Sequence, residues 1–372
     1  MSVVGIVGLG TMGLGLVQVY ALASFAVVCT DRDPAARAAA LGRLTDTWAR
    51  RVAQGRMSEA ERQAALAQVT VAASLAAFAP AALVIEAIVE RLEPKRALFA
   101  ELEAVVGPEA VLATNTSSLS VAALAEFARS PGRILGLHFF NPAPVMALVE
   151  LVPHAGTFTR SLKIARELTE NAGKIVIDAP DRPGFIVNRS ARPFYGEALA
   201  MLEEGRGATE VDAAMVAAGY RLGPFALIDL IGADINLAAT EGLQAAMNGH
   251  PRYHVFAALQ TQVTRGHLGR KSGRGFVTPP VETPAPADAE AVALRIEAAI
   301  VNEAAWLLAE GGVTEAGIDT ALRLGLNFPR GPFGMLARHG KATIRETLAT
   351  LAALAPVHLQ GRYTPAPLLE AT

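Results

Sequence analysis

The opening of the chain constrains its fold more than any other stretch. A β-branched run, Val3–Val7, leads into glycines at positions 8, 10 and 13, and a second apolar run, Ala26–Thr30, ends at Asp31. In a dinucleotide-binding βαβ unit the first glycine makes the turn out of the strand. The second lets the backbone approach a pyrophosphate, and the third lets the helix lie close to the sheet. The acid after the second strand accepts hydrogen bonds from ribose hydroxyls. The opening therefore predicts a dinucleotide site formed by Gly8, Gly10, Thr11, Met12, Gly13 and Asp31.

Composition narrows the class of protein. The chain has 372 residues, of which 52% are hydrophobic and 18% charged, as expected for several well-buried globular domains. A net charge of −2 gives no general affinity for polyanions, so we expect no nucleic-acid partner. The single cysteine, Cys29, excludes an intrachain disulfide, and we assign no metal ligands. Glycines interrupt the uncharged first thirty residues and no other apolar run approaches a bilayer span, so we expect a cytoplasmic protein without a membrane segment.

The pattern of elements predicts two kinds of domain. After Asp31, strand signals alternate with helical segments as far as Ile175–Ile177, which indicates an α/β domain with a doubly wound, mostly parallel sheet of the Rossmann type. From Gly184 onward one helix follows another, which predicts an all-α region. We expect a dinucleotide-binding domain over residues 1–182 and a first helical domain over 183–278. A proline-rich linker over 279–289 then precedes a second helical unit over 290–372.

The helical region contains an internal repeat. Glu197–Gly205 is echoed by Glu303–Gly311, and Gly223-Pro224-Phe225 recurs as Gly331-Pro332-Phe333. A Thr-Glu pair followed by an aspartate lies between these blocks in both places. Matched blocks in the same order indicate two copies of one helical unit.

Four polar residues are candidates for chemistry. His138 lies at the end of a buried strand and is a candidate general base, and Glu150 in the next strand could hydrogen-bond one of its ring nitrogens. A carboxylate inside an apolar strand is costly unless it is paired, which argues that Glu150 has a partner. Ser117 ends another strand and could donate to a substrate oxygen, although a helix cap is an alternative for this run of polar residues. Asn188 is a polar residue early in an apolar helix.

Six motifs stand in the order and spacing of a known family. They are GLGTMG at 8–13, EAIVE at 86–90, NTSSL at 115–119, HFFNP at 138–142, LVELV at 148–152 and PGFIVNR at 183–189. Together they resemble the L-3-hydroxyacyl-CoA dehydrogenase family. The resemblance runs from the start of the chain to about Val277, and the repeated unit resembles longer members that carry a second helical copy.

The resemblance implies NAD as cofactor and an acyl-CoA substrate in fatty acid metabolism and β-oxidation. It makes His138 the base for the C3 hydroxyl and Glu150 the group that orients it. Ser117 and Asn188 would bind the hydroxyl and carbonyl oxygens of the substrate. The substrate would enter between the two domains. The resemblance also assigns further residues to the NAD site: Glu90, Lys95, Asn115, Asn141 and Lys271.

Alternatives remain for the activity and for the assembly. A dehydrogenase of free hydroxy acids or sugar acids, similar to the crystallin-like branch, is a second enzyme reading. A non-catalytic NAD-binding protein is a third. The second helical copy lacks the PGFIVNR motif and is therefore expected to be structural. Single-copy relatives pair this domain between subunits, so the resemblance implies either a homodimer or a monomer in which the second copy mimics the dimer contact.

Overall fold

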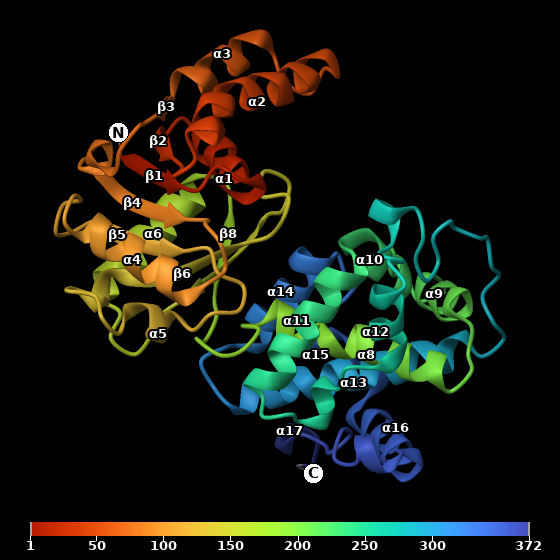
Figure 1. Cartoon of the computed structure of the whole chain (residues 1–372). Coiled ribbons are helices and arrows are strands. Elements are labelled where there is room, and N and C mark those ends of the chain that lie inside the picture. Colours follow the sequence, from red (N-terminus) through yellow and green to blue (C-terminus); the bar gives the residue numbers. More distant parts are fainter. Residues whose placement is uncertain (1, 371–372) are drawn as a thin grey trace. The chain divides into compact units, whose positions relative to one another are not determined.

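The computed structural model describes residues 2–370, which divide into two compact units at Arg182 and Pro183. The strands and helices of the first unit, shown in red to yellow in Figure 1, alternate along the chain. They are β1 (Val3–Val7), α1 (Thr11–Leu22), β2 (Ala26–Thr30), α2 (Pro34–Ala53), α3 (Glu59–Ala67), β3 (Val69–Val71), β4 (Ala81–Glu86), α4 (Leu92–Glu103), β5 (Val111–Thr114), α5 (Val121–Ala125), β6 (Ile134–Phe139), β7 (Leu148–Val152), α6 (Thr159–Asn171) and β8 (Ile175–Asp178).

The strands form one eight-stranded sheet in the order β3-β2-β1-β4-β5-β6-β7-β8. The neighbouring strands are parallel except β6 and β7, which run antiparallel. The order reverses on either side of β1, so the ends of β1 and β4 flank the crevice where ligands bind in doubly wound folds. The predicted Rossmann-type, mostly parallel sheet is confirmed.

Local backbone geometry fixes both ends of helix α1. It begins at Thr11, because Gly10 is extended and serves as its N-cap. It ends at Leu22, since Ser24 has a positive φ of 64° that no helix continues through. After β2 the chain forms a helical hairpin of α2 and α3, and Ser58 and Glu61 form a capping box at the start of α3.

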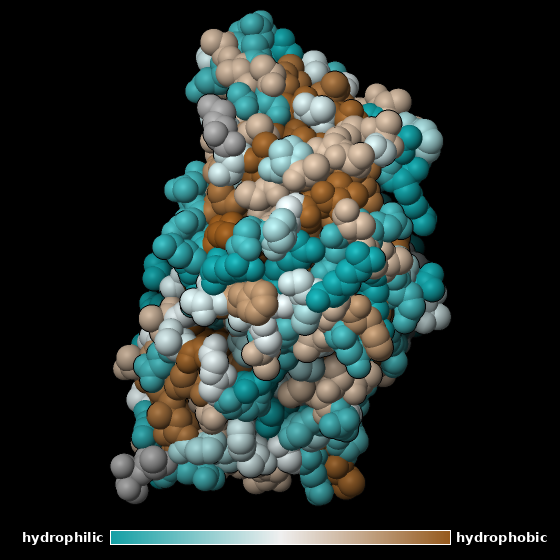
Figure 2. Space-filling model, turned by 90° about the vertical axis from the view of Figure 1, so that its left-hand side faces the viewer, coloured by the Kyte–Doolittle hydropathy of each residue, from teal (hydrophilic) through white to brown (hydrophobic). Residues whose placement is uncertain are grey.

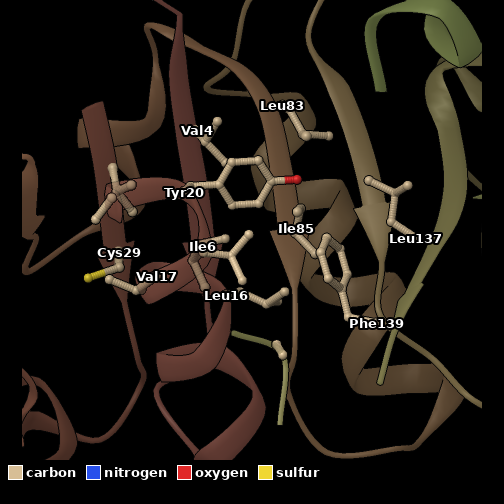
Figure 3. Packing of buried hydrophobic residues seen from close by; sticks show 14 of the residues in the cluster. Val4, Ile6, Leu16, Val17, Tyr20, Cys29, Leu83, Ile85, Leu137 and Phe139 are labelled. Atoms are coloured by element: carbon tan, nitrogen blue, oxygen red, sulfur yellow. The ribbon is translucent and has the colours of Figure 1, made fainter. Parts of the chain in front are cut away.

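The core of the first unit lies between α1 and the sheet. Tyr20 projects from α1 among residues of β1 and β4, and Phe139 lies nearby at the end of β6 (Figure 3). The Tyr20 hydroxyl is fully buried and is hydrogen-bonded to the Thr169 hydroxyl at 3.1 Å. Cys29 packs in the same cluster, so its thiol is a core group as the sequence indicates.

The second unit is helical, as predicted. Its helices, green to blue in Figure 1, are α7 (Val187–Ser190), α8 (Arg192–Glu203), α9 (Ala208–Ala217), α10 (Pro224–Ile231), α11 (Ala233–Ala246), α12 (Ala257–Thr264), α13 (Ala289–Ala309), α14 (Glu315–Leu326), α15 (Pro332–His339), α16 (Lys341–Leu354) and α17 (Pro367–Glu370). Helix α13 has 21 residues and contacts α8, α9, α15, α16 and α17. It is therefore the central helix of this unit.

The repeated sequence blocks fold alike. Asp212 accepts hydrogen bonds from the N–H groups of Phe225 and Ala226, and Asp319 accepts the same pair from Phe333 and Gly334. These contacts fix the starts of α10 and α15, which have 8 residues each. Helices α11 and α16 then follow, with 14 residues each, and both start after a glycine with positive φ.

Within residues 2–370 no helix has both the length and the hydropathy needed to cross a membrane. On the face shown in Figure 2, hydrophilic and hydrophobic residues are interspersed.

Candidate active site

Two glycines of the opening loop are required by the packing of the protein itself. Gly8 has φ +100°, and a Cβ there would lie 2.5 Å from the carbonyl oxygen of Ala87. A Cβ on Gly13 would lie 1.7 Å from the carbonyl oxygen of Gly8. A Cβ on Gly10, in contrast, would meet no described atom within 4 Å. The third glycine therefore seats α1 against the loop, and the second leaves open space where a pyrophosphate would approach the N-terminus of α1.

Asp31 joins the loop to the end of β2. One carboxylate oxygen accepts a hydrogen bond from Leu9 N–H at 2.7 Å, and the other accepts one from Asp33 N–H at 2.9 Å. The Leu9 side chain is 1% exposed and points into the core, so it does not obstruct the loop. A cleft of about 790 Å³ opens beside Gly8, Gly10 and Asp31. The open Gly10 and the half-buried acid beside this cleft fit the pyrophosphate and ribose of NAD.

A buried ion pair supports the neighbouring strand ends. Lys95 is 1% exposed, and its Nζ lies 2.6 Å from a carboxylate oxygen of Glu86 and 3.1 Å from one of Glu90. The Thr114 hydroxyl also donates to Glu86. Glu86 was assigned no role from the sequence. One sequence feature could have identified Glu86: it is a carboxylate at the end of an apolar strand, with a lysine nine residues later. A buried acid requires such a cation.

Glu90 holds the loop that carries Ser117. One of its carboxylate oxygens accepts hydrogen bonds from the Thr116 hydroxyl at 2.6 Å and from Ser117 N–H at 2.9 Å. Partial burial raises the pKa of Glu90, but the Lys95 ammonium and these hydrogen bonds outweigh it and leave the pKa below its ordinary value. Glu90 is therefore an anion at neutral pH, and its charge fixes the backbone of the loop. The Ser117 side chain itself is exposed.

His138 and Glu150 are direct partners across β6 and β7. The antiparallel register places them opposite one another, and Nδ1 of His138 lies 2.6 Å from Oε2 of Glu150. Their side chains are 7% and 0% exposed. Because an ionised carboxylate only accepts, Nδ1 carries the hydrogen in this pair. The Phe140 ring packs against the imidazole, with 4.5 Å between ring centroids. The ring is thus held in one tautomer and one orientation.

Two predicted cofactor residues lie next to the strand that carries His138. The side-chain oxygen of Asn115 accepts a hydrogen bond from Phe139 N–H at 2.9 Å, which ties the end of β5 to the end of β6. Asn141 is exposed directly after Phe140. The ends of β1, β4, β5 and β6 therefore carry, at one edge of the sheet, the glycine loop, Glu90, Ser117 and His138.

The other two predicted site residues belong to the second unit. Asn188 lies in α7, is half-buried, and its side-chain amide has no hydrogen-bond partner in the described part of the chain. Lys271 is 43% exposed, and its Nζ lies 2.5 Å and 2.7 Å from the two carboxylate oxygens of Asp234.

Comparison with known proteins identifies the family. Residues 3–182 match the family model described as 3-hydroxyacyl-CoA dehydrogenase, NAD binding domain. Residues 184–279 and 292–372 both match the model of the C-terminal domain of the same family, in agreement with the internal repeat.

Relatives of two lengths match the chain. A 3-hydroxybutyryl-CoA dehydrogenase of Bradyrhizobium diazoefficiens is 38% identical over 73% of this chain and 94% of its own length. A 3-hydroxyadipyl-CoA dehydrogenase of Escherichia coli K12 is 42% identical over 73% of this chain, and the match spans 58% of that relative. The crystal structure of a 3-hydroxybutyryl-CoA dehydrogenase from Escherichia coli K12 superposes with a TM-score of 0.91 at 32% identity. It covers 99% of this chain and 97% of its own. The chain therefore belongs to the 3-hydroxyacyl-CoA dehydrogenase family of NAD-dependent oxidoreductases.

Proposed function

We propose that this protein oxidises L-3-hydroxyacyl-CoA to 3-oxoacyl-CoA with NAD, reversibly, and that His138 and Glu150 form its general base. The observation that carries the proposal is the buried hydrogen bond of 2.6 Å between His138 Nδ1 and Glu150 Oε2 at the end of the sheet. A histidine oriented by a buried carboxylate is the arrangement that removes a proton from a hydroxyl.

The residues of the chain would divide the reaction between them. NAD, when bound, accepts the hydride that leaves C3 of the substrate. His138 takes the hydroxyl proton at Nε2 as the C3–H bond breaks and the carbonyl forms. Glu150 stabilises the resulting imidazolium through Nδ1, and the Ser117 hydroxyl donates a hydrogen bond to the reacting oxygen. Asn188 would bind the thioester end of the substrate. The assignments of Asn115, Asn141 and Lys271 to the cofactor site stay predictions.

A rate comparison tests the base. We expect His138→Gln to lower the rate of NADH oxidation with acetoacetyl-CoA by at least about 100-fold, since a general base contributes roughly that much or more. His154→Gln is the matched control: this histidine follows β7, and its Nε2 contacts the Pro131 carbonyl oxygen at 3.0 Å instead of a carboxylate. The control variant is expected to keep the wild-type rate.

The substrates separate this proposal from its alternatives. Turnover of acetoacetyl-CoA, without turnover of free acetoacetate, supports the acyl-CoA reaction. Turnover of the free acid alone would favour the hydroxy-acid branch. NADH binding without turnover of either compound would leave a non-catalytic protein. The names of the relatives include one acyl group that ends in a methyl, hydroxybutyryl, and one that ends in a carboxylate, hydroxyadipyl.

We also propose that the protein is a monomer whose second helical copy takes the place of a partner subunit. Contacts of α13 with α8 and α9, which join the two copies within one chain, support this. Sedimentation of the full chain tests it, and a stable dimer would contradict it. The cytoplasmic location expected from the sequence remains a prediction.

A further inference from the structure

Arg192 is a buried arginine without an acid. It is the first residue of α8 and 8% exposed, and within residues 2–370 no carboxylate forms an ion pair with it. Its Nε donates to the Asn188 carbonyl oxygen at 3.0 Å and its Nη1 to the Thr240 hydroxyl at 3.0 Å. Both acceptors are uncharged, and Nη2 has no hydrogen-bond partner among the described residues. A guanidinium keeps its charge at all physiological pH values, so burying it without an anion is costly.

Other buried arginines of the chain are paired. Arg133 lies 3.5 Å from a carboxylate oxygen of Glu103, and Arg189 lies 2.7 Å from one of Glu303. Arg362 lies 2.8 Å from one of Glu197. Arg192 is therefore an exception to the way this protein buries arginine.

The second helical copy shows that the fold does not need a charge at this position. Alignment of the repeat places Ala298 where the first copy has Arg192, and Ala298 is fully buried. The three polar residues around Arg192 are replaced as well. Asn188, Asn236 and Thr240 of the first copy correspond to Leu294, Ile344 and Leu348 of the second. Ile344 and Leu348 are fully buried, so the same helices pack with an apolar set.

The polar set of the first copy is connected but incomplete. The Thr240 hydroxyl, which accepts from Arg192, donates to the Asn236 carbonyl oxygen at 2.7 Å. Asn236 is 2% exposed, yet its side-chain oxygen has no hydrogen-bond partner in the described residues. The guanidinium carbon also lies 4.9 Å from the centre of the Tyr195 ring. The unpaired Nη2 of Arg192 is a charged donor that an anionic ligand group would complete. The Asn236 oxygen is an acceptor and takes no part in binding an anion.

The spacing from Asn188 limits what this anion can be. Asn188 lies in α7 and Arg192 begins α8, but Ala191 between them keeps helical dihedral angles. The Cβ atoms of Asn188 and Arg192 are therefore about one helical turn apart, roughly 5–6 Å. A chain of three or four carbons spans about that distance at roughly 1.3 Å per bond. A carboxylate at the far end of a short acyl chain fits this span.

We propose that Arg192 binds a carboxylate at the end of the acyl chain, so that the preferred substrate is a 3-hydroxyacyl-CoA with an anionic tail of about six carbons. This inference rests on the proposed function, because the position of the acyl chain is taken from the role of Asn188. Arg192 then determines specificity, and takes no part in the transfer of the proton or the hydride.

A matched pair of substrates tests the inference. 3-Oxoadipyl-CoA and 3-oxohexanoyl-CoA have acyl chains of equal length and differ only in a terminal carboxylate or methyl. We expect the wild type to prefer 3-oxoadipyl-CoA in kcat/KM, measured by NADH oxidation. Arg192→Gln is expected to lower this kcat/KM about 30-fold or more, as for removal of one partner of a buried charge pair, and to leave the value for 3-oxohexanoyl-CoA within about threefold. Arg192→Lys, which keeps the charge, is expected to lose less.

Several outcomes would overturn it. A parallel loss for both substrates in Arg192→Gln, or a wild type that uses 3-oxohexanoyl-CoA at least as well, would contradict a role in specificity. Binding of adipyl-CoA and hexanoyl-CoA by calorimetry gives a readout without turnover. If the wild type turned over neither thioester, the proposed function would fail. A wild-type preference for binding adipyl-CoA that Arg192→Gln abolishes would still support the anion site, and equal binding of both would contradict it.

Discussion

The two copies of the helical unit share their scaffold and differ in their polar chemistry. Each copy has an aspartate that fixes the start of a short helix, Asp212 in the first and Asp319 in the second. In each copy, an arginine and the tyrosine that follows it both bind one glutamate of the other copy. Tyr253 donates to Glu303 at 2.6 Å, and Tyr363 donates to Glu197 at 2.9 Å. The groups that hold the fold together are therefore present twice.

The most extensive shared feature is a reciprocal set of ion pairs, in which an arginine of each copy binds two glutamates of the other copy. Arg189 of the first copy binds Glu303 and, with both terminal nitrogens, Glu310 of the second. Arg295 of the second copy binds Glu197 and Glu204 of the first in the same way. The residues that differ are Asn188 and Arg192 and their neighbours, which are apolar in the second copy. Packing and ion pairing are thus common to both copies, and substrate chemistry is expected in the first alone.

Breaking the shared ion pairs is expected to have the largest effect. Glu303→Gln leaves Arg252 without an acid and Glu197→Gln does the same to Arg362, so each variant should lower the free energy of unfolding by about 3–5 kcal/mol. Urea denaturation measures this loss, and the reciprocal geometry predicts similar losses for the two variants. Glu167→Gln is the control, because Glu167 pairs with Lys163 on the surface at 3.8 Å, and it should cost less than about 0.5 kcal/mol. If only one of Glu303→Gln and Glu197→Gln lowered the free energy of unfolding, the ion pairs of the two copies would not be equivalent.

Exchanging corresponding residues between the copies tests whether the first copy alone binds the substrate. Asn188→Leu gives the first copy the residue of the second and should lower kcat/KM for acetoacetyl-CoA about 100-fold, the usual cost of losing one positioned hydrogen-bond donor in an active site. Leu294→Asn makes the opposite change in the second copy and should leave kcat/KM unchanged. If Leu294→Asn lowered activity as much as Asn188→Leu, the second copy would not be merely structural.

The same comparison explains what the sequence could and could not predict. Gly8, Gly13 and the strands around them follow a local pattern, so the sheet and the glycine loop were predictable. The repeat was visible because matched blocks keep their order. The ion pairs between Arg189 and Glu303 join residues more than a hundred positions apart, and no local period reports them. Arg192 had a signal that was not used, since alignment of the copies sets a charge against Ala298.

Asp212 and Asp319 are expected to make the free energy of unfolding depend on pH. Burial raises the pKa of Asp212 to about 7, although hydrogen bonds from Phe225 and Ala226 oppose the shift. The pKa of Asp319 is also raised by burial. Because the folded pKa of Asp212 exceeds the unfolded value, the folded state holds an extra proton between about pH 4 and pH 7.

The free energy of unfolding should therefore fall as the pH rises through this window. One proton limits the slope to about 1.4 kcal/mol per pH unit. Urea denaturation at several pH values measures the slope, and Asp212→Asn should remove its contribution. If Asp212→Asn left the slope unchanged while Asp319→Asn reduced it, the roles of the two aspartates would be reversed.

The smallest expected effect on stability concerns the loop of the first copy that carries Lys271. Lys271 and Asp234 form an exposed ion pair, and Lys271→Met or Asp234→Asn should each change the free energy of unfolding by less than about 1 kcal/mol. The two variants remove the same ion pair but leave different charges behind. If Lys271 binds the cofactor, as the family resemblance implies, Lys271→Met raises KM for NADH several-fold and Asp234→Asn does not. If both variants kept the wild-type KM for NADH, Lys271 would be a surface residue without a role in cofactor binding. A rise in both would mean that the ion pair orders the loop around Lys271, so that Asp234 supports cofactor binding by holding the backbone of this loop.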